Sequence, residues 1–152
     1  MVERSSVVSL RIIDDENVRA VVDLSVSQEQ KAFVASNVFS LAQAFATSNV
    51  WVRAVYADET AAGFVMLADD PDTERYYLWR FMIDERYQHM GFGRAAMSLM
   101  HEYVASRPGG TKVSLSFVPG DAGPGPFYKS LGYVETGEVK DGEVEAVLDL
   151  TQ

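Results

Sequence analysis

The stretch MIDERYQHMGFGRAAM, from Met82 to Met97, decides the fold. An apolar, strand-like run ends at Ile83 and a helical pattern begins at Gly93, so Gly91 and Gly93 stand between a strand and a helix. The first N–H groups of a helix have no partner inside it and lie at the positive end of the helix dipole. A glycine-rich turn there lets these N–H groups surround phosphate oxygens. The stretch therefore predicts a phosphate-binding loop, with a tight turn that binds nothing as the alternative.

Residue patterns on both sides of this loop predict a single α+β (α/β) domain over residues 1–152. Short helices precede a strand hairpin, and a helix, a strand, a short helix and a second hairpin follow. Asp14 or Asp15 is the expected N-cap of the first helix, and Ser40 that of the third. The expected strands are 9–13, 50–57, 61–68, 75–83, 112–118, 133–139 and 143–150, and the expected helices are 14–26, 28–36, 40–46, 93–106 and 127–133.

Composition excludes several classes of function. The chain has no cysteine and only two histidines, His89 and His101, so we expect no metal site. No apolar run approaches the ~20 residues that a membrane span needs. Charged residues interrupt the N-terminus too early for a signal peptide, so we expect a cytoplasmic protein without a membrane partner. A net charge of -9 argues against a nucleic-acid partner and permits a cationic substrate.

The charge is distributed unevenly along the chain. Between Arg75 and Arg94 there are four arginines against Asp84 and Glu85, so this segment is positive within an acidic protein. The least acidic neighbourhood therefore contains the two glycines, which agrees with an anionic ligand. A chance distribution over a solvated surface is the alternative.

Two known types of phosphate loop do not fit this sequence. GFGRAA imitates the G-x-G-x-x-A turn of dinucleotide-binding folds, but there the first glycine follows its strand almost directly. Here DERYQHM separates Ile83 from Gly91, and an apparent antiparallel hairpin precedes the loop. The Gly-Lys-Ser/Thr signature of the Walker loop is absent.

QHMGFG, residues 88–93, matches the pattern Q/R-x-x-G-x-G/A and resembles the pyrophosphate loop of the GNAT superfamily of N-acetyltransferases. FYKSLGY, residues 127–133, is similar to the short tyrosine-bearing helix of that superfamily. The segments VSQEQ and RFMIDERYQ further resemble bacterial spermine/spermidine acetyltransferases. The resemblance covers nearly the whole chain and implies the GNAT fold, a mixed and mostly antiparallel sheet flanked by helices.

The resemblance implies direct transfer of an acetyl group from acetyl-CoA to an amine. Tyr128 matches the tyrosine that protonates the leaving thiolate. The edge of the strand at Met82 and Ile83 is expected to pair with the pantetheine amides. Arg86, His89 and Arg94 are expected to add positive charge around the pyrophosphate. The residues expected to hold the pyrophosphate end of CoA are Gln88, His89, Met90, Gly91, Phe92, Gly93 and Arg94.

The acceptor that the resemblance implies is a small primary amine, with a polyamine as the first choice. Glu29, Trp79 and Asp84 are the candidate substrate-binding residues, and Glu29, Asp84 and Glu85 are candidate bases or ammonium partners. Each of these carboxylates could equally be a surface charge, and Trp79 a core or cleft residue. A protein N-terminus, a lysine or an amine antibiotic stays open as the acceptor, and a homodimer as the oligomeric state.

One segment departs from the superfamily. Many members carry an asparagine soon after the strand that precedes the last helix, whereas PGDAGPGP, residues 119–126, has none. An ionised Asp121 cannot donate a hydrogen bond in its place. A CoA-binding module that has lost catalysis is therefore an alternative to the enzyme, and a dinucleotide-binding oxidoreductase is a third reading.

Overall fold

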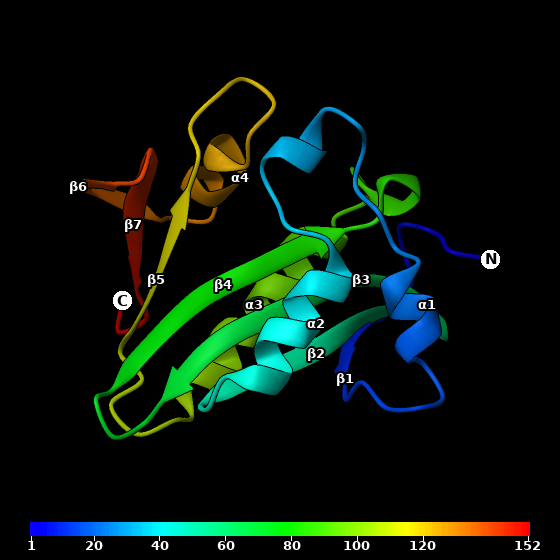
Figure 1. The fold of residues 1–152 in the computed structure, drawn as a ribbon, viewed down its shortest axis with the longest axis horizontal. Helices are drawn as coiled ribbons and strands as arrows, with labels where there is room; N and C mark the ends of the chain where they lie inside the picture. The colour runs from blue at the N-terminus through cyan, green and yellow to red at the C-terminus, as the bar shows by residue number, and fades with distance from the viewer.

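One mixed sheet of seven strands runs through the computed structural model, which describes residues 1–152. The strand order is β1-β2-β3-β4-β5-β7-β6, and every neighbouring pair is antiparallel except β4 and β5 (Figure 1). This confirms the mixed, mostly antiparallel sheet expected from the sequence. The strands are β1 (Val8–Arg11), β2 (Val50–Ala57), β3 (Thr60–Asp70), β4 (Arg75–Ile83), β5 (Lys112–Phe117), β6 (Val134–Lys140) and β7 (Glu143–Asp149).

Helices cover both faces of the sheet. The front face in Figure 1 carries α1 (Val18–Val22) and α2 (Asn37–Ala46), and the other face carries α3 (Phe92–Ala105) and α4 (Gly125–Ser130). Two single 3-10 turns lie in the connections, η1 (Gln30–Ala32) and η2 (Glu85–Tyr87). No helix combines the length and the apolar character needed to cross a membrane.

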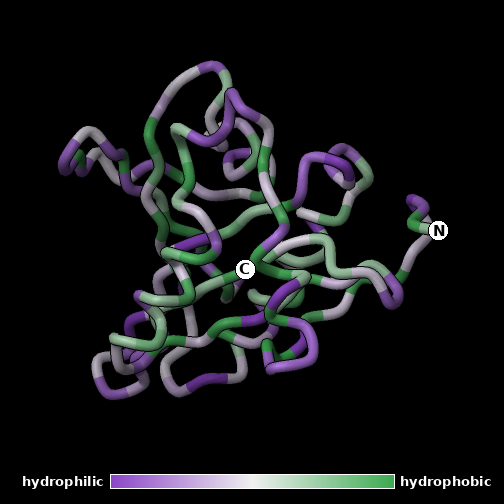
Figure 2. Tube along the Cα trace, turned by 45° about the vertical axis from the view of Figure 1, so that its right-hand side comes forward, coloured by the Kyte–Doolittle hydropathy of each residue, from purple (hydrophilic) through white to green (hydrophobic).

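Alternation along the central strands fills a core on each face. On β3, Val65 and Leu67 pack in the cluster that contains Met97 and Met100 of α3. The intervening Phe64 and Met66 of β3 pack in the cluster that contains residues of α1. Successive strand side chains point to opposite faces, so a strand covered on both sides must be apolar throughout. The hydrophilic stretches of the chain gather in the turns around the rim (Figure 2).

One predicted helix and the starts of two others were wrong. Residues 28–36 form only the 3-10 turn η1. The helix predicted over 40–46 is α2, which begins at Asn37, and its N-cap is Ser36, whose side chain accepts the N–H of Phe39 at 3.2 Å. Ser40 is buried in the first turn and donates to the Ser36 carbonyl at 2.9 Å. Ahead of α1, the Asp14 carboxylate accepts N–H groups of the preceding turn, so the helix starts only at Val18. Ser and Asp can hold either a helix end or a turn, and the sequence pattern does not distinguish the two.

The strands β4 and β5 separate halfway along their length. Only Tyr77 pairs with Ser114, and Leu78 with Leu115. Trp79 then forms a bulge, because its neighbours Leu78 and Arg80 pair with consecutive residues of β3. Beyond this point β5 stays paired with β7 and leaves β4, as Figure 1 shows. The second half of β4 therefore has a free edge on the side of β5.

Candidate active site

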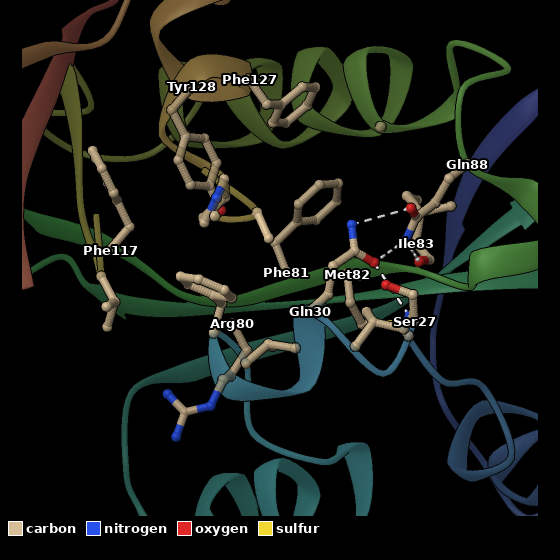
Figure 3. Close-up of a pocket in the computed structure, with 18 of the residues that line it drawn as sticks. Ser27, Gln30, Arg80, Phe81, Met82, Ile83, Gln88, Phe117, Phe127 and Tyr128 are labelled. Atoms are coloured by element: carbon tan, nitrogen blue, oxygen red, sulfur yellow. Dashed lines mark hydrogen bonds between the residues drawn. The ribbon is translucent and has the colours of Figure 1, made fainter. Parts of the chain in front are cut away.

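A cleft of about 1300 Å³ lies where β4 and β5 separate. Five segments line it: the connection between α1 and α2, the second half of β4, the loop before α3, the chain from β5 into α4 (Figure 3), and the start of β7 at Glu143. The sequence-predicted residues that line it are Glu29, Trp79, Met82, Ile83, Gln88, His89, Gly91, Gly93, Arg94 and Tyr128. The sheet thus brings together residues that are up to a hundred positions apart in the chain.

The loop from Gln88 to Arg94 has the geometry of an anion site. No protein acceptor takes the N–H groups from His89 to Arg94, and the first helical bond of α3 runs from Ala95 to the Gly91 carbonyl at 3.1 Å. His89 and Gly91 have left-handed φ angles of 63° and 89°. A Cβ at Gly91 would meet nothing within 4 Å, so the backbone angle is what favours glycine there. These free N–H groups at the start of a 14-residue helix fit a pyrophosphate.

At Gly93 the ring of Phe127 leaves little room for a side chain. A Cβ on this residue would lie 3.3 Å from the ring of Phe127, which is tight for any carbon contact. Phe92, between the two glycines, is buried in the core, and neither Phe92 nor Met90 lines the cleft. These two residues are thus placed to contribute backbone N–H groups and not side chains.

Asp84 differs from its predicted role as a substrate ligand. Its carboxylate is buried outside the cleft lining and accepts the Ser25 N–H at 2.9 Å, the Arg86 N–H at 3.0 Å and Arg86 Nε at 2.8 Å. Burial by itself raises the pKa of Asp84, but the hydrogen bonds from Arg86 and Ser25 outweigh it, and the pKa lies below its usual value. Asp84 therefore holds segments of the protein together, and it neutralises the Arg86 charge that was expected to serve CoA.

Tyr128 projects from α4 toward the cleft (Figure 3). Its side chain is 7% exposed and packs among the rings of Phe117, Phe127 and Tyr133, with centroids 5.6 to 6.0 Å away. No protein group hydrogen-bonds the Tyr128 hydroxyl. Burial raises the pKa of this phenol, so it stays protonated at neutral pH and can act as a donor.

A polar pair, Tyr133 and His101, packs against the Tyr128 ring and was not predicted from the sequence. The Tyr133 hydroxyl lies 2.8 Å from His101 Nε2, and Tyr133 meets the Tyr128 ring edge-on. Burial lowers the pKa of His101 to about 4, so its ring is neutral at pH 7. The sequence offered no signal for this contact, because it joins the middle of α3 to the chain that follows α4.

The other side of the cleft is formed by side chains from scattered segments. Trp79 and Arg80 come from the bulge in β4, and the Arg80 guanidinium donates to Gln43 of α2 at 2.8 Å and to the Trp79 carbonyl at 3.1 Å. Phe33, which follows η1, reaches the loop after β5. A Cβ at Gly120 or Gly123 would lie 3.3 or 3.0 Å from its ring. Phe33 and Arg80 were not among the predicted site residues.

Four exposed carboxylates line the cleft, those of Glu29, Glu85, Asp121 and Glu143. No group of three or more His, Asp and Glu side chains is placed to hold a metal ion. The cleft thus combines an anion-binding loop, a buried phenol and an acidic rim.

Comparison with known proteins agrees with this geometry. A spermine/spermidine N(1)-acetyltransferase of Bacillus subtilis is 27% identical over 150 residues, covering 94% of this chain and 99% of the relative. A domain from Methanocaldococcus jannaschii superposes with a TM-score of 0.77 at 15% identity, covering 95% of this chain and 99% of that one. The PaiA N-acetyltransferase of Thermoplasma acidophilum, solved in complex with coenzyme A, gives 0.68 at 15% identity, covering 94% and 99%.

Residues 18–133 match the model of the Acetyltransferase (GNAT) family. This match contains the connection between α1 and α2, the glycine loop and the tyrosine of α4. It confirms the resemblance drawn from QHMGFG and FYKSLGY, and the chain therefore belongs to the GNAT family of acetyltransferases, which makes it an acyltransferase.

Proposed function

We propose that this protein transfers the acetyl group of acetyl-CoA directly to a primary amine, and that the acceptor is a small polyamine such as spermidine or spermine. The observation that carries the proposal is the content of a single cleft. Free helix-terminal N–H groups, an unpaired strand edge, a buried phenol and a rim of carboxylates all border the same space.

The donor half would be held mainly by backbone groups. Acetyl-CoA, when bound, supplies the thioester whose acetyl group is transferred. The N–H groups from His89 to Arg94 fit its pyrophosphate, and the Arg94 guanidinium, which shares only a 3.1 Å contact with Ser130 Oγ, can add charge. The β4 edge at Met82 and Ile83 is available to the amides of the pantetheine arm, in the manner of an added strand.

Tyr128 would act on the departing sulfur. The amine nitrogen forms a bond to the acetyl carbon, the carbon–sulfur bond breaks, and the sulfur leaves with the electron pair. The Tyr128 O–H would donate to that sulfur and supply its proton, which Tyr128 then regains from water, while the proton lost by the amine passes to a rim carboxylate or to water. A tyrosine is neutral at pH 7 at its ordinary pKa, and burial raises the pKa of Tyr128 further, so the phenol enters this step with its proton in place.

The acceptor side supports a cationic amine. Glu29, Glu85, Asp121 and Glu143 are exposed around the cleft and would attract a polycation. The one opposing charge in this part of the lining, Arg80, is tied to Gln43 and turned toward α2 (Figure 3). The Bacillus relative named for spermine and spermidine supports the same class of acceptor.

Thiol release from acetyl-CoA, measured over a panel of polyamines, amino acids, aminoglycosides and peptides, tests the proposal. We expect the highest kcat/KM with a polyamine and no activity without an amine. Equilibrium titrations with CoA and with NAD serve as the binding control, and only CoA should bind. A preference for an uncharged or anionic acceptor, or binding of NAD in place of CoA, would contradict the proposal.

A CoA-binding module without catalysis is the second candidate, and the chain before α4 favours it. The asparagine of many family members is missing there, and the cleft is lined instead by Asp121. CoA binding at normal affinity, together with no turnover over the whole amine panel, would support this candidate over the enzyme.

A further inference from the structure

The connection between α1 and α2 is joined by hydrogen bonds to the chain that leads into the donor loop. The Ser25 N–H donates to Asp84 Oδ2 at 2.9 Å, and the Glu85 N–H donates to the Ser25 carbonyl at 3.0 Å. Farther along both segments, the side-chain amides of Gln30 and Gln88 face each other (Figure 3). The acceptor side of the cleft therefore contacts the donor side through a defined polar pair.

Each amide in this pair has a fixed orientation. Gln30 Oε1 accepts the Ser27 N–H at 3.2 Å, and a backbone N–H can only donate. Gln88 Nε2 donates to the Ile83 carbonyl at 2.8 Å, and a carbonyl can only accept. With both ends fixed, Gln88 Nε2 donates to Gln30 Oε1 at 2.9 Å and Gln30 Nε2 donates to Gln88 Oε1 at 3.2 Å.

We propose that Gln30 is a positioning residue for the acyl-donor loop. Its amide fixes Gln88, the first residue of the loop that carries the unpaired N–H groups from His89 to Arg94. Gln30 also belongs to η1, whose neighbours Glu29 and Phe33 line the acceptor side. The amide pair thus holds the donor loop in place from the acceptor wall. The identity of the donor rests on the proposed function.

The fixed orientations predict an asymmetry between two substitutions of equal charge. In Gln30→Glu, the new carboxylate still accepts from Ser27 and from Gln88 Nε2; one donated bond is lost, and the new oxygen faces one acceptor, Gln88 Oε1. In Gln88→Glu, both donated bonds are lost and the new carboxylate faces two acceptors, the Ile83 carbonyl and Gln30 Oε1. The charge added in Gln30→Glu and the charge added in Gln88→Glu occupy positions within hydrogen-bond distance of each other. Each variant should therefore repel a bound phosphate to nearly the same extent. A difference between the variants therefore measures the bridge.

Calorimetric titration of CoA into the wild type, Gln28→Glu, Gln30→Glu and Gln88→Glu tests this inference, with thermal unfolding to confirm that each variant is folded. Gln28 is the matched control, because it is an exposed residue of the same segment, lies outside the cleft lining and makes no hydrogen bond through its side chain. We expect the Kd of CoA to rise about tenfold in Gln88→Glu and about twofold in Gln30→Glu. Gln28→Glu should bind like the wild type.

Steady-state kinetics separate positioning from a general loss of structure. We expect the KM for acetyl-CoA to rise in Gln88→Glu by about the same factor as the Kd of CoA, and by less in Gln30→Glu, whereas Gln28→Glu should keep both the KM and the kcat of the wild type. Equal CoA affinities in Gln30→Glu and Gln88→Glu would overturn the bridge while leaving the proposed function intact. A wild-type protein that does not bind CoA would overturn the proposed function, and the role of the bridge with it.

Discussion

The two sides of the cleft are built in different ways. In the proposed function, the donor side consists of the free edge of β4 and one continuous stretch, Gln88 to Arg94, and both present backbone groups. The acceptor side consists of side chains from four separate segments, represented by Phe33, Trp79, Asp121 and Glu143. Backbone groups are common to every sequence, so the donor side needs only the right φ angles and space. The acceptor side depends on which side chains the fold brings together.

This difference implies that the two halves respond differently to substitution. Changes on the donor side should affect CoA binding whatever the acceptor. Changes on the acceptor side should affect the acceptor KM and leave CoA binding alone. Tyr128 stands between the two halves, so its substitution should affect the reaction step and neither binding step.

Tyr128→Phe should have the largest effect. The substitution keeps the ring that packs against Phe117, Phe127 and Tyr133 and removes only the hydroxyl. If the O–H donates to the departing sulfur, kcat should fall about 100-fold, the lower end for general acid catalysis, because a thiolate is a fairly good leaving group. The Kd of CoA should barely change. Unchanged turnover, in an assay limited by chemistry, would show that the role is wrong; a loss of CoA affinity alone would make Tyr128 a donor contact.

Gly93→Val should weaken CoA binding by about tenfold or more. Even a Cβ at this position lies 3.3 Å from the Phe127 ring, and the two methyl groups of valine would also fill the space above the free N–H groups. Thermal unfolding should show a folded protein, since the residue stands on the cleft side of α3. Calorimetry with CoA is the measurement, and a folded variant with wild-type affinity would remove this loop from the donor side.

Phe33→Ala should affect the acceptor side by a smaller factor. The ring reaches across the cleft to Gly120 and Gly123, and its removal widens the acceptor end. We expect the acceptor KM to rise about threefold to tenfold with little change in the Kd of CoA. Phe45→Ala is the matched control, because Phe45 is 94% exposed on α2 and away from the cleft. If both variants behave alike, the Phe33 contact does not shape the acceptor side.

Added salt should have the smallest effect, and it should change the acceptor KM more than the KM for acetyl-CoA. Exposed carboxylates attract a cationic acceptor through water, and that attraction is screened as the Debye length shortens. The acceptor KM should rise about twofold to threefold between low salt and 0.5 M salt, by more than the KM for acetyl-CoA. An acceptor KM that does not depend on salt would argue against electrostatic attraction by Glu29, Glu85, Asp121 and Glu143.

The sequence predicted the elements around the glycine loop well because their signals are local. The strand predicted over residues 75–83 is β4, and both of its ends are as predicted. The Asp-Gly turn between β6 and β7, Asp141 and Gly142, has φ angles of 52° and 79°, which only a few residue types adopt easily. Pro126 stands in the first turn of α4 and Gly132 just after its end, the positions that favour these residue types. Such signals depend on residues within one or two turns of each other.

The sequence did not predict the surroundings of individual polar side chains, because burial and pairing are not local. Asp84 reads in the sequence like an exposed carboxylate beside the loop, yet it is buried between Ser25 and Arg86. His101 shows no partner in the sequence, yet it contacts Tyr133 and carries a lowered pKa. In both cases the partner lies on a different element.

The sequence by itself determined the family, most of the order of the elements and the glycine loop before α3. A helix start with left-handed glycine angles is a property of a few consecutive residues, and any chain that folds around it keeps those N–H groups free. Only the tertiary structure decided the acceptor side, the environment of Tyr128 and the pairing of Gln30 with Gln88. These features exist because β4 bulges at Trp79 and parts from β5, and the separation of two strands brings segments into contact that no short stretch of sequence contains.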